Sequence, residues 1–489
     1  MSGDTIAAIA TGLTNAGISV IRVSGEQAFS IGNRIFQGEG NVDFNEGKGY
    51  TAHFGRIVFE GEVIDEVVVL IMRGPRSYTG EDTLEISCHG GVLVTRRVLE
   101  AVLECGARSA EPGEFTKRAF LNGRMDLSEA EAVIGLIDAK NDFAIKASVR
   151  QLSGKLSDKI KNIRENILNS VSYIEAALDD PEHISLDGYG DNVRAVVDES
   201  LSEISALINS FEDGKVLSEG VKTVILGKPN AGKSSLMNLF AGEEKAIVTE
   251  IAGTTRDVLS EQITIEGIGF NMVDTAGIRD TEDTVEKIGV ERSLKQAGEA
   301  DLILYVVDSS TELDENDRKI LEFIRDNNKK SIIVYNKTDL EPVISMEDVR
   351  GLVGDARVNG EPRHLKCPSG MAWPTSQSLP LARLTTIIGI SAKEATDFGR
   401  LKECMADCFR DGEISLNDQV VVTNIRHKEA LLEAKKSLEA VLVSMDDGFG
   451  EDMWVIDMMD AYGSLGKIIG EAVEDDVVDR VFEKFCMGK

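Results

Sequence analysis

The residues with the clearest chemistry lie in one glycine-rich stretch, Gly227 to Ser235. It reads G-x-x-x-x-G-K-S, follows the apolar run Val221 to Leu226, and leads into a second apolar segment at Leu236. In a strand–loop–helix arrangement, the glycines let backbone N–H groups turn inward, Lys233 reaches terminal phosphates, and the Ser234 hydroxyl ligates Mg²⁺. The stretch therefore predicts a cradle for a nucleoside triphosphate. The alternative is an ordinary glycine turn between a strand and a helix.

Two further motifs predict which base is bound. Asn336-Lys337-Thr338-Asp339 follows the apolar run Ser331 to Tyr335, and Ser391-Ala392-Lys393 follows Thr386 to Ile390. The Asp339 carboxylate can accept hydrogen bonds from the N1–H and N2–H₂ donors of guanine, whereas adenine has no such donor pair. An unpaired buried carboxylate costs about 1–3 kcal/mol, so we expect guanine to be preferred by about tenfold or more. The backbone N–H groups of Ser391 to Lys393 are expected to meet the guanine carbonyl.

A fourth motif, Asp274-Thr275-Ala276-Gly277, suits the γ-phosphate. Asp274 can hold the magnesium shell through water, and the N–H of Gly277 can sense the phosphate. The four motifs, each at the end of a candidate strand, resemble those of small GTPases of the translation-factor class. Ile278 then stands where Ras-like proteins carry the glutamine that orients the attacking water, so another group must do that work.

The segment between the phosphate loop and this motif offers a cation site instead. Thr255 is placed to ligate magnesium, and the turn before it can aim carbonyl groups at a cation. With the amide oxygen of Asn230, those carbonyls can hold a monovalent ion where other proteins place an arginine finger, which contributes on the order of 10³–10⁵ in rate.

The elements that must position these motifs alternate between strand and helix over residues 216–411, which predicts an α/β P-loop GTPase domain with a mainly parallel sheet. Helices are expected to begin near Ser234, Thr284 and Asp314. Within this domain, residues 341–386 are proline-rich and longer than such domains need, so we expect an extended, disordered insert. The candidate strands are Val221 to Leu226, Gln262 to Glu266, Gly269 to Val273, Leu302 to Val307, Ser331 to Tyr335 and Thr386 to Ile390.

The regions that flank this domain have different patterns of apolar residues. Residues 1–120 alternate short β-like runs with two helical segments, which predicts an α+β domain. Apolar residues recur at helical spacing over 121–215 and again over 412–489. We therefore expect an all-α domain, built from both sides, into which the nucleotide domain is inserted.

Composition limits the remaining choices. A chain of 489 residues exceeds one core, so two or three domains are expected. The formal net charge of −31 repels nucleic acid, so contact with it must be local or delegated to a partner. The helical row Lys155, Lys159, Lys161 and Arg164 is expected to be a solvated face. Scattered cysteines fit reduced thiols, and no apolar run approaches a membrane span, so we expect a soluble, cytoplasmic protein.

Further marks make the resemblance specific. The chain is similar, nearly end to end, to the MnmE (TrmE) family of potassium-dependent GTPases of tRNA wobble-uridine modification. The marks are Asp4-Thr5-Ile6-Ala7-Ala8, Tyr78 to Asp82, Pro112 to Phe115, Arg118 to Leu127 and a terminal Cys-x-Gly-Lys.

The resemblance assigns roles in the nucleotide domain. Potassium would be held by Asn230, Thr249, Ile251 and Thr254, and magnesium by Ser234 and Thr255. Glu286 would orient the attacking water through a bridging water once two G domains meet face to face; the residues alone favour a carboxylate at a helix start, and only the resemblance favours the catalytic role. The residues expected to bind GTP are Asn230, Ala231, Gly232, Lys233, Ser234, Ser235, Thr249, Thr254, Thr255, Asp274, Thr275, Ala276, Gly277, Asn336, Lys337, Asp339, Ser391, Ala392 and Lys393.

The resemblance also assigns a second site and the partners. The N-terminal domain would bind 5-formyl-tetrahydrofolate, or a related one-carbon folate, through Arg22, Glu85, Arg124 and Lys489, and would form the homodimer. Cys486 in the tail is a further candidate catalytic residue. The family's partner is the FAD- and NADH-using MnmG protein. The two form a heterotetramer that adds an aminomethyl or carboxymethylaminomethyl group to C5 of the uridine, and the partner would hold most of the tRNA.

Two other functions compete with this one. A non-modifying regulatory GTPase, such as a ribosome-assembly factor, would bind no folate and would not need Cys486 or Lys489. A mechanical GTPase on a membrane would want a basic or amphipathic surface, which a charge of −31 disfavours.

Overall fold

A computed structural model describes residues 3–38, 42–242, 260–274, 294–327, 329–354, 356–358, 385–410, 420–471, 475–483, 485, 486 and 488. The chain forms two compact units. The first comprises Met1–Asp138, Ser148–Asn209 and Asn424–Lys489, and the second comprises Ala139–Ala147 and Ser210–Thr423. The second unit therefore interrupts the first in sequence. The domain boundaries predicted near residues 120, 215 and 411 stay predictions.

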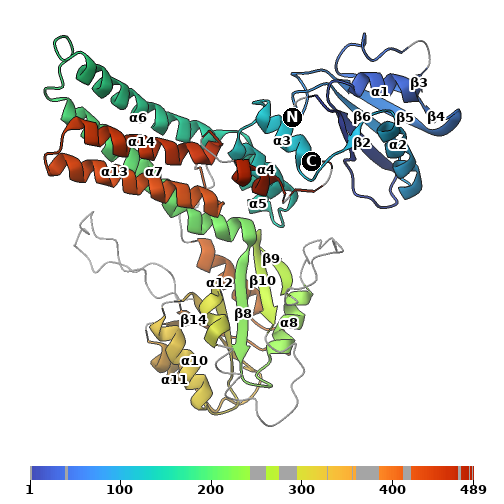
Figure 1. Cartoon of the computed structure of the whole chain (residues 1–489). Coiled ribbons are helices and arrows are strands. Elements are labelled where there is room, and N and C mark those ends of the chain that lie inside the picture. The colour runs from blue at the N-terminus through green and yellow to red at the C-terminus, as the bar shows by residue number, and fades with distance from the viewer. Residues whose placement is uncertain are drawn as a thin grey trace. The chain divides into compact units, whose positions relative to one another are not determined.

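The first unit begins with a seven-stranded mixed sheet whose neighbours pair antiparallel, except for the parallel β1–β7 pair. Helices α1 (Ala28–Ile35) and α2 (Val92–Glu104) lie along one face, where alternate strand residues such as Ile21, Ile86 and Val69 are buried (Figure 1). This alternation is what a sheet with one covered face requires. In spatial order the strands are β3 (Phe36–Gly38), β4 (Thr51–Phe59), β5 (Glu62–Met72), β6 (Thr83–His89), β2 (Ile18–Ser24), β1 (Ile6–Ile9) and β7 (Arg108–Ser109).

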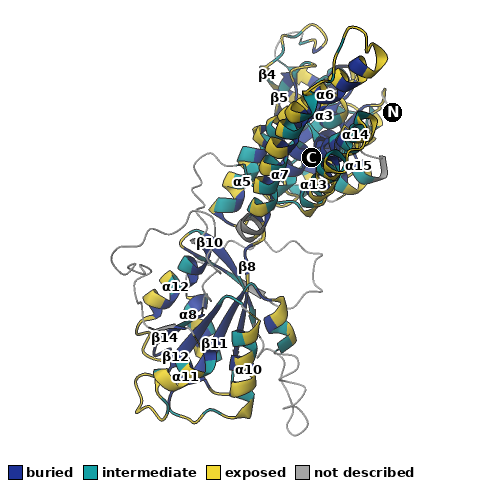
Figure 2. Cartoon of the chain, turned by 90° about the vertical axis from the view of Figure 1, so that its left-hand side faces the viewer, coloured by how far each residue is buried: buried dark blue, intermediate teal, exposed yellow. Residues whose placement is uncertain are grey.

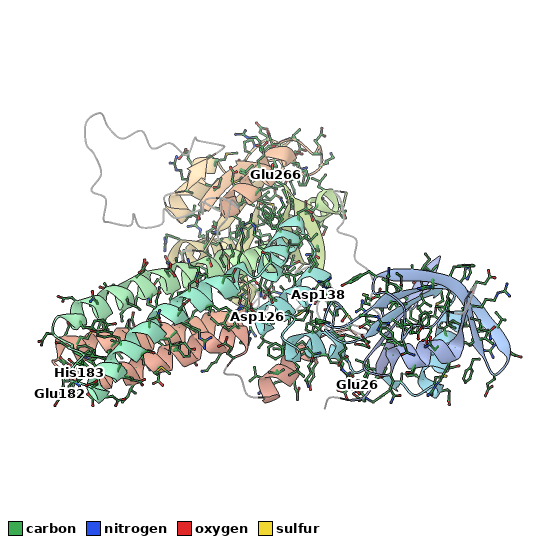
Figure 3. All side chains as sticks on the ribbon, turned by 90° about the horizontal axis from the view of Figure 1, so that it is seen from above. Glu26, Asp126, Asp138, Glu182, His183 and Glu266 are labelled. Atoms are coloured by element: carbon green, nitrogen blue, oxygen red, sulfur yellow. The ribbon has the colours of Figure 1, made fainter. Side chains whose placement is uncertain are left out.

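The rest of the first unit is helical. Helix α6 (Lys155–Asp179) buries Ile160, Ile163, Ile167 and other residues at a spacing of three or four, which makes one face apolar. The turn after α6 holds Glu182 and His183 (Figure 3). The remaining helices are α3 (Glu114–Leu121), α4 (Leu127–Ile137), α13 (Ile425–Asp446), α14 (Glu451–Ile469) and α15 (Asp475–Phe482), while α5 (Asp142–Leu152) and α7 (Tyr189–Glu219) belong in part to each unit.

A buried ion cluster joins α4 to the start of α13. Arg426 donates two hydrogen bonds of 2.8 Å to the Glu131 carboxylate, and His427 Nε2 lies 2.6 Å from it. Burial opposes ionisation of Glu131, but the neighbouring His427 and Arg426 outweigh it and lower its pKa to about 2. The cluster therefore stabilises the contact between two helices far apart in the sequence.

The second unit is built on another seven-stranded sheet. Every neighbouring pair is parallel except β9–β10, which is a hairpin. Strands β11 and β12 are buried along their whole length, as expected for strands covered on both faces (Figure 2). In spatial order the strands are β13 (Arg357–Val358), β14 (Thr385–Gly389), β12 (Ser331–Asn336), β11 (Leu302–Asp308), β8 (Val221–Gly227), β10 (Ile268–Asp274) and β9 (Ser260–Ile265).

Helices cover both faces of this sheet. On one face α8 (Lys233–Ala241) and α12 (Phe398–Arg410) share a core that includes Phe240 and Phe398. On the other, α10 (Glu315–Asp326) and α11 (Met346–Val353) share a second core. This is the predicted layered α/β architecture.

Most predicted strands are confirmed to within two residues at their ends. The expectation of disorder over 341–386 is wrong for residues 346–353, which form α11 with a capping box between Ser345 and Asp348. The helix expected near Thr284 lies outside the described residues. Among the described helices, none is long and apolar enough to cross a membrane.

Candidate functional site: a guanine-nucleotide pocket

The glycine-rich loop joins β8 to α8 as the sequence predicts. Gly227 has φ 146° and Gly232 has φ 106°, a region that favours glycine. The surrounding atoms also leave no room for a side chain at either position. A Cβ on Gly227 would lie 2.4 Å from the Val306 carbonyl oxygen, and one on Gly232 would lie 2.0 Å from Asn336 Nδ2. Only glycine fits at either position, and α8 begins directly after the second one.

Lys233 lies within this loop. Its ammonium group donates hydrogen bonds to the carbonyl oxygens of Gly227 (2.7 Å) and Lys228 (2.6 Å). Ser234 and Ser235 are exposed in the first turn of α8. The helix N-terminus, the Lys233 ammonium group and the Ser234 hydroxyl therefore belong to one short loop-to-helix segment, and they are the groups that a magnesium-bound triphosphate needs.

Asn336 connects the phosphate loop to the motifs that are predicted to select the base. Its side chain is 2% exposed, donates to the Ala231 carbonyl oxygen (2.7 Å), and accepts from the Ala392 N–H (2.9 Å). Asn336 ends β12, so this one buried amide joins its own loop to the loops that follow β8 and β14. Buried amides of this kind are costly to leave unpaired, so the three loops form one structural unit.

Asp339 is exposed beside this unit. Its Oδ1 accepts a hydrogen bond from Ser391 Oγ (2.6 Å), which is the main reason that the pKa of Asp339 lies below its usual range. Oδ2 has no partner in the part of the chain that the structure describes. An ionised carboxylate with a free oxygen can accept the N–H donors of guanine. Lys393 lies in the same loop.

Lys337 is held in place by a residue that the sequence analysis missed. Lys337 has φ 66°, and its ammonium group lies 2.5 Å from Asp308 Oδ2. Asp308 is the last residue of the buried strand β11 and also accepts from the Ser310 N–H and hydroxyl. Although Asp308 is largely buried, these bonds and the Lys337 charge lower its pKa. The signal for Asp308 in the sequence was a carboxylate directly after the apolar run Leu302 to Val307.

Lys228 is a second missed residue. It forms ion pairs with Asp317 (2.5 Å) and Asp314 (3.2 Å), the capping-box residues of α10. This ties the phosphate loop to the helix that follows β11. The capping box before an apolar run is visible in the sequence.

The other half of the predicted nucleotide site falls on residues whose placement is not described. Asp274 ends β10 and pairs with Ile225 of β8, so its backbone reaches the same edge of the sheet. The predicted ligands and catalytic residue that lie outside the described residues are Thr249, Ile251, Thr254, Thr255, Thr275, Ala276, Gly277 and Glu286.

A second candidate site lies in the first unit. Arg22 and Glu85 are register partners on β2 and β6, and Arg22 donates to Glu85 from Nε (2.9 Å) and Nη2 (2.8 Å). The guanidinium stacks 5.2 Å from the centre of the Tyr78 ring, and Nη1 donates to the Gly488 carbonyl oxygen (3.3 Å). Two of the predicted folate residues therefore meet each other and the C-terminal tail.

The remaining folate and tail residues are placed as follows. Arg124 donates to the Ser77 carbonyl oxygen (3.3 Å), next in sequence to Tyr78. Cys486 is exposed, and its carbonyl oxygen accepts from the Gly113 N–H (3.5 Å). A Cβ on Gly488 would lie 2.3 Å from the Ile9 carbonyl oxygen, so the tail packs closely on β1. Lys489 lies outside the described residues.

The fold and the pocket together define a P-loop protein that binds guanine nucleotides. A family model described as the MnmE helical domain matches residues 127–486, and one described as the GTP-binding protein TrmE N-terminus matches residues 5–124. The chain belongs to the MnmE family of tRNA modification GTPases. It is a GTP hydrolase with a TrmE-type N-terminal domain, a helical domain and an inserted G domain.

Curated relatives match along the full chain. The tRNA modification GTPase MnmE of Lachnoclostridium phytofermentans is 52% identical and covers 100% of both chains. The MnmE proteins of Acetivibrio thermocellus and Thermoanaerobacter pseudethanolicus are each 42% identical over 99% of both chains. A solved structure of Era from Aquifex aeolicus is 27% identical over 44% of this chain and 66% of its own, with a TM-score of 0.25, which is too low to carry an argument.

Proposed function

We propose that this GTPase is potassium-dependent and acts with an FAD-bearing protein of the MnmG type. Together they would add an aminomethyl or carboxymethylaminomethyl group to C5 of the wobble uridine of tRNA, in the cytoplasm. The observation that carries the proposal is the buried Asn336 side chain, which joins the phosphate loop to the Ser391–Lys393 loop, in a chain that matches MnmE relatives from end to end.

Potassium would be held by Asn230, Thr249, Ile251 and Thr254, and magnesium by Ser234 and Thr255. The support comes from Asn230, which is exposed in the phosphate loop at φ 64°. Its side chain has no hydrogen-bond partner among the described residues, so the amide oxygen is available to a cation. The cation supplies positive charge for the transition state where Ras-like enzymes rely on an arginine.

Hydrolysis would follow from pairing of two G domains, with Glu286 orienting the attacking water and GTP turnover driving a conformational cycle. The N-terminal domain would hold the homodimer together. Its sheet supports this, since α1 and α2 cover one face while the other carries Phe54 (61% exposed) and Val68 (41% exposed), which are register partners. Exposed apolar pairs on a sheet face are typical of a protein interface.

The same open face carries the proposed folate site. Register partners run from Ala52 through Leu70 and Glu85 to Arg22, one row away from the row that contains Phe54 and Val68. Charged and aromatic groups next to a dimer face suit 5-formyl-tetrahydrofolate: Arg22, Arg124 and Lys489 suit its carbonyl or carboxylate groups, and Glu85 suits its N–H donors. The exposed Cys486 in the adjoining tail would act in the modification step.

The acidic surface fits a division of labour in which the partner holds most of the tRNA, because a net charge of −31 repels phosphate. The two proteins would form a heterotetramer.

Replacement of potassium by sodium tests the proposal. GTP turnover by the full-length protein should fall on the order of 10³-fold or more, the effect of losing an arginine-finger charge. Asn230→Ala should lower turnover in potassium to the sodium level, while GDP affinity stays close to wild type. Equal turnover in the two salts would overturn the ion assignment.

A further inference from the structure

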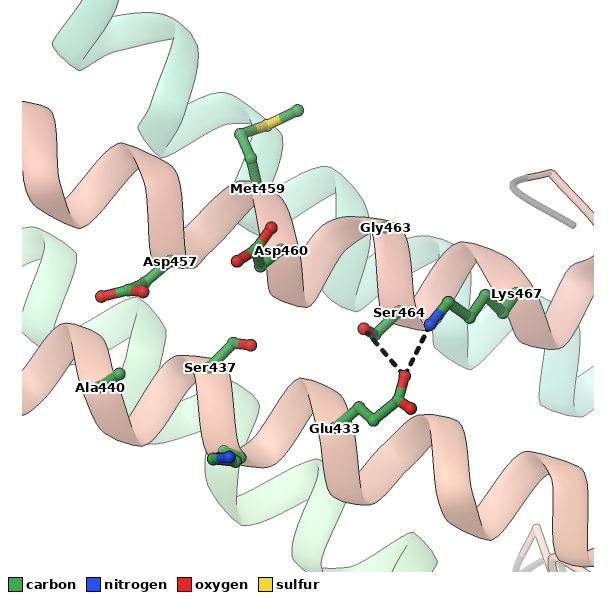
Figure 4. Close-up of a pocket in the computed structure, with 10 residues that line it drawn as sticks. Glu433, Ser437, Ala440, Asp457, Met459, Asp460, Gly463, Ser464 and Lys467 are labelled. Atoms are coloured by element: carbon green, nitrogen blue, oxygen red, sulfur yellow. Dashed lines mark hydrogen bonds and ion pairs between the residues drawn. The ribbon is translucent and has the colours of Figure 1, made fainter.

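The outer surface of the helical part of the first unit carries a groove between α13 and α14 (Figure 4), here called the α13–α14 groove. It has a volume of about 670 Å³. Small residues, including Ser437 and Ala440 from α13 and Gly463 from α14, line it. No step of the proposed reaction uses these residues.

Two carboxylates in the groove are not neutralised. Glu433 is paired, since it accepts from Lys467 Nζ (2.7 Å) and the Ser464 hydroxyl (3.5 Å). Asp457 and Asp460 form neither an ion pair nor a side-chain hydrogen bond with any described residue. Partial burial, together with the charge of Asp460, raises the pKa of Asp457. Like charges one helical turn apart destabilise a helix, so this pair costs stability unless a cation from outside meets it.

Gly463 is a second and independent sign of an external partner. It lies inside α14, where glycine costs about 0.5–1 kcal/mol relative to alanine. Its φ is not in the left-handed region, and a Cβ built on it would meet no atom within 4 Å. Nothing within the described chain therefore requires a glycine here. A glycine would be required at this position if another molecule approached closely along the groove.

Apolar side chains border the same surface. Ile456 is 55% exposed and Met459 is 40% exposed, both on α14 near the unpaired carboxylates. Apolar anchors beside a few charges are typical of protein interfaces, whereas nucleic acid would be repelled by Asp457 and Asp460. The groove is thus suited to a protein segment that bears positive charge.

We propose that the α13–α14 groove docks a lysine- or arginine-bearing segment of the flavoprotein partner, with its cation between Asp457 and Asp460 and its backbone close to Gly463. The inference rests on the proposed function, because that function supplies the partner. Charge complementarity selects the segment, and the missing Cβ of Gly463 lets it come close.

The test is the affinity of the full-length protein for the purified flavoprotein of the same organism, measured by calorimetry at low and moderate salt. The double variant Asp457→Asn/Asp460→Asn should bind about tenfold or more weakly at low salt and should show a smaller salt dependence. GTP turnover of the variant alone should be unchanged. A matched control is Glu165→Gln/Glu175→Gln, which removes two exposed carboxylates of α6 that form no ion pair with any residue the structure describes, and should not alter affinity.

Two further variants separate contact from charge. Gly463→Leu fills the groove with a better helix former, so it should fold at least as well as wild type by circular dichroism and still bind about tenfold or more weakly. Lys436→Glu adds negative charge to the groove lining and should not weaken the binding of a basic segment. Weakened binding by Lys436→Glu would mean that the occupant is acidic and would overturn the proposal.

The outcomes distinguish this inference from the function on which it rests. If wild-type protein does not bind the flavoprotein, the proposed partnership fails. If wild-type protein binds and both Asp457→Asn/Asp460→Asn and Gly463→Leu bind equally well, the partnership stands and the groove assignment is overturned. A change in self-association of the variants, measured by sedimentation, would assign the groove to a second copy of the chain and would also overturn the proposal.

Discussion

The loops around Asn336 and Asp339 in the G domain differ from the Arg22–Glu85 site in what holds their functional groups in place. In the G domain a 2%-exposed neutral amide, Asn336, fixes the loops, and the group proposed to meet the base, Asp339, keeps one oxygen free among the described residues. At the folate candidate, the two charged groups bind each other, with side chains 13% and 23% exposed. The first site is organised before its ligand arrives, whereas a ligand at the second must compete with an ion pair.

The Glu131–Arg426 pair shows what a purely structural ion pair in this protein looks like. Glu131 is 8% exposed, and Arg426 also donates to the Lys467 and Ile468 carbonyl oxygens, so all its bonds lie within the protein. Arg22 instead lies against the Tyr78 ring and donates to the C-terminal tail. The carboxylates therefore separate the two pairs: Glu131 is 8% exposed and also pairs with His427, whereas Glu85 is 23% exposed and Arg22 is its one partner among the described residues.

The largest effect is expected for Asn336→Ala. The change leaves the buried Ala231 carbonyl and Ala392 N–H unpaired, each at about 1–3 kcal/mol, so GTP affinity should fall about 10²–10³-fold. Titration with a fluorescent GTP analogue measures it. Asn238→Ala, an exposed asparagine on α8, is the control and should bind as wild type does. Near-normal affinity in Asn336→Ala would contradict preorganisation by this amide.

The next effect is expected on folding. Glu131→Gln leaves the Arg426 charge without its buried counter-ion, so the free energy of unfolding of the first unit should fall by about 3–5 kcal/mol. Because the pKa of Glu131 is lowered to about 2 in the folded protein, its contribution is complete above the unfolded value near 4.5 and disappears as the pH falls from there toward 2. Urea unfolding of both proteins across this range measures it. A difference that stays constant down to pH 2 would show that the charge of Glu131 is not the cause.

A smaller change in affinity but a larger change in specificity is expected for Asp339→Asn. An amide cannot accept both guanine donors, so GTP should bind about tenfold or more weakly, while xanthosine triphosphate should bind better because its C2 carbonyl can accept from the amide. Competition between the two nucleotides is the measurement. An unchanged preference for GTP would remove Asp339 from base recognition.

The smallest effect is expected for Glu85→Gln. The amide can still accept from Arg22 but loses the charge that suits folate N–H donors, so affinity for 5-formyl-tetrahydrofolate should fall a few-fold to about tenfold. The unfolding midpoint should move much less than it does for Glu131→Gln, because the Glu85 carboxylate is more exposed than that of Glu131. Calorimetric titration and a thermal melt give both values. Equal losses of stability in the two variants would make Arg22–Glu85 another structural pair.

Much of the fold was predictable because its signals are local. Gly232 and Lys233 sit in a spaced motif after an apolar strand, and that spacing is set by backbone geometry that does not depend on distant parts of the chain. Strand positions in the sheet of the second unit followed from apolar runs. The α11 helix was missed because surrounding prolines concealed its Ser345 capping box.

The remaining features depend on contacts between distant residues. Asn336 could be assigned to the base motif, but its bonds to Ala231 and Ala392 span more than a hundred and more than fifty residues respectively. The prediction that Arg164 belongs to a solvated row is wrong: it is 6% exposed, pairs with Glu471 and stacks on Tyr462. The helical spacing of the basic residues was visible in the sequence. The acidic partner of Arg164 was not, because it lies about three hundred residues later in the chain.

The central claim, that the GTP pocket serves modification of tRNA, is tested most directly by the wobble uridines of cells that lack this protein. Mass spectrometry of their tRNA should show loss of the C5 aminomethyl-type groups, restored by the wild-type gene and not by the Asn336→Ala variant. Unchanged wobble uridines in the deletion strain would contradict the account.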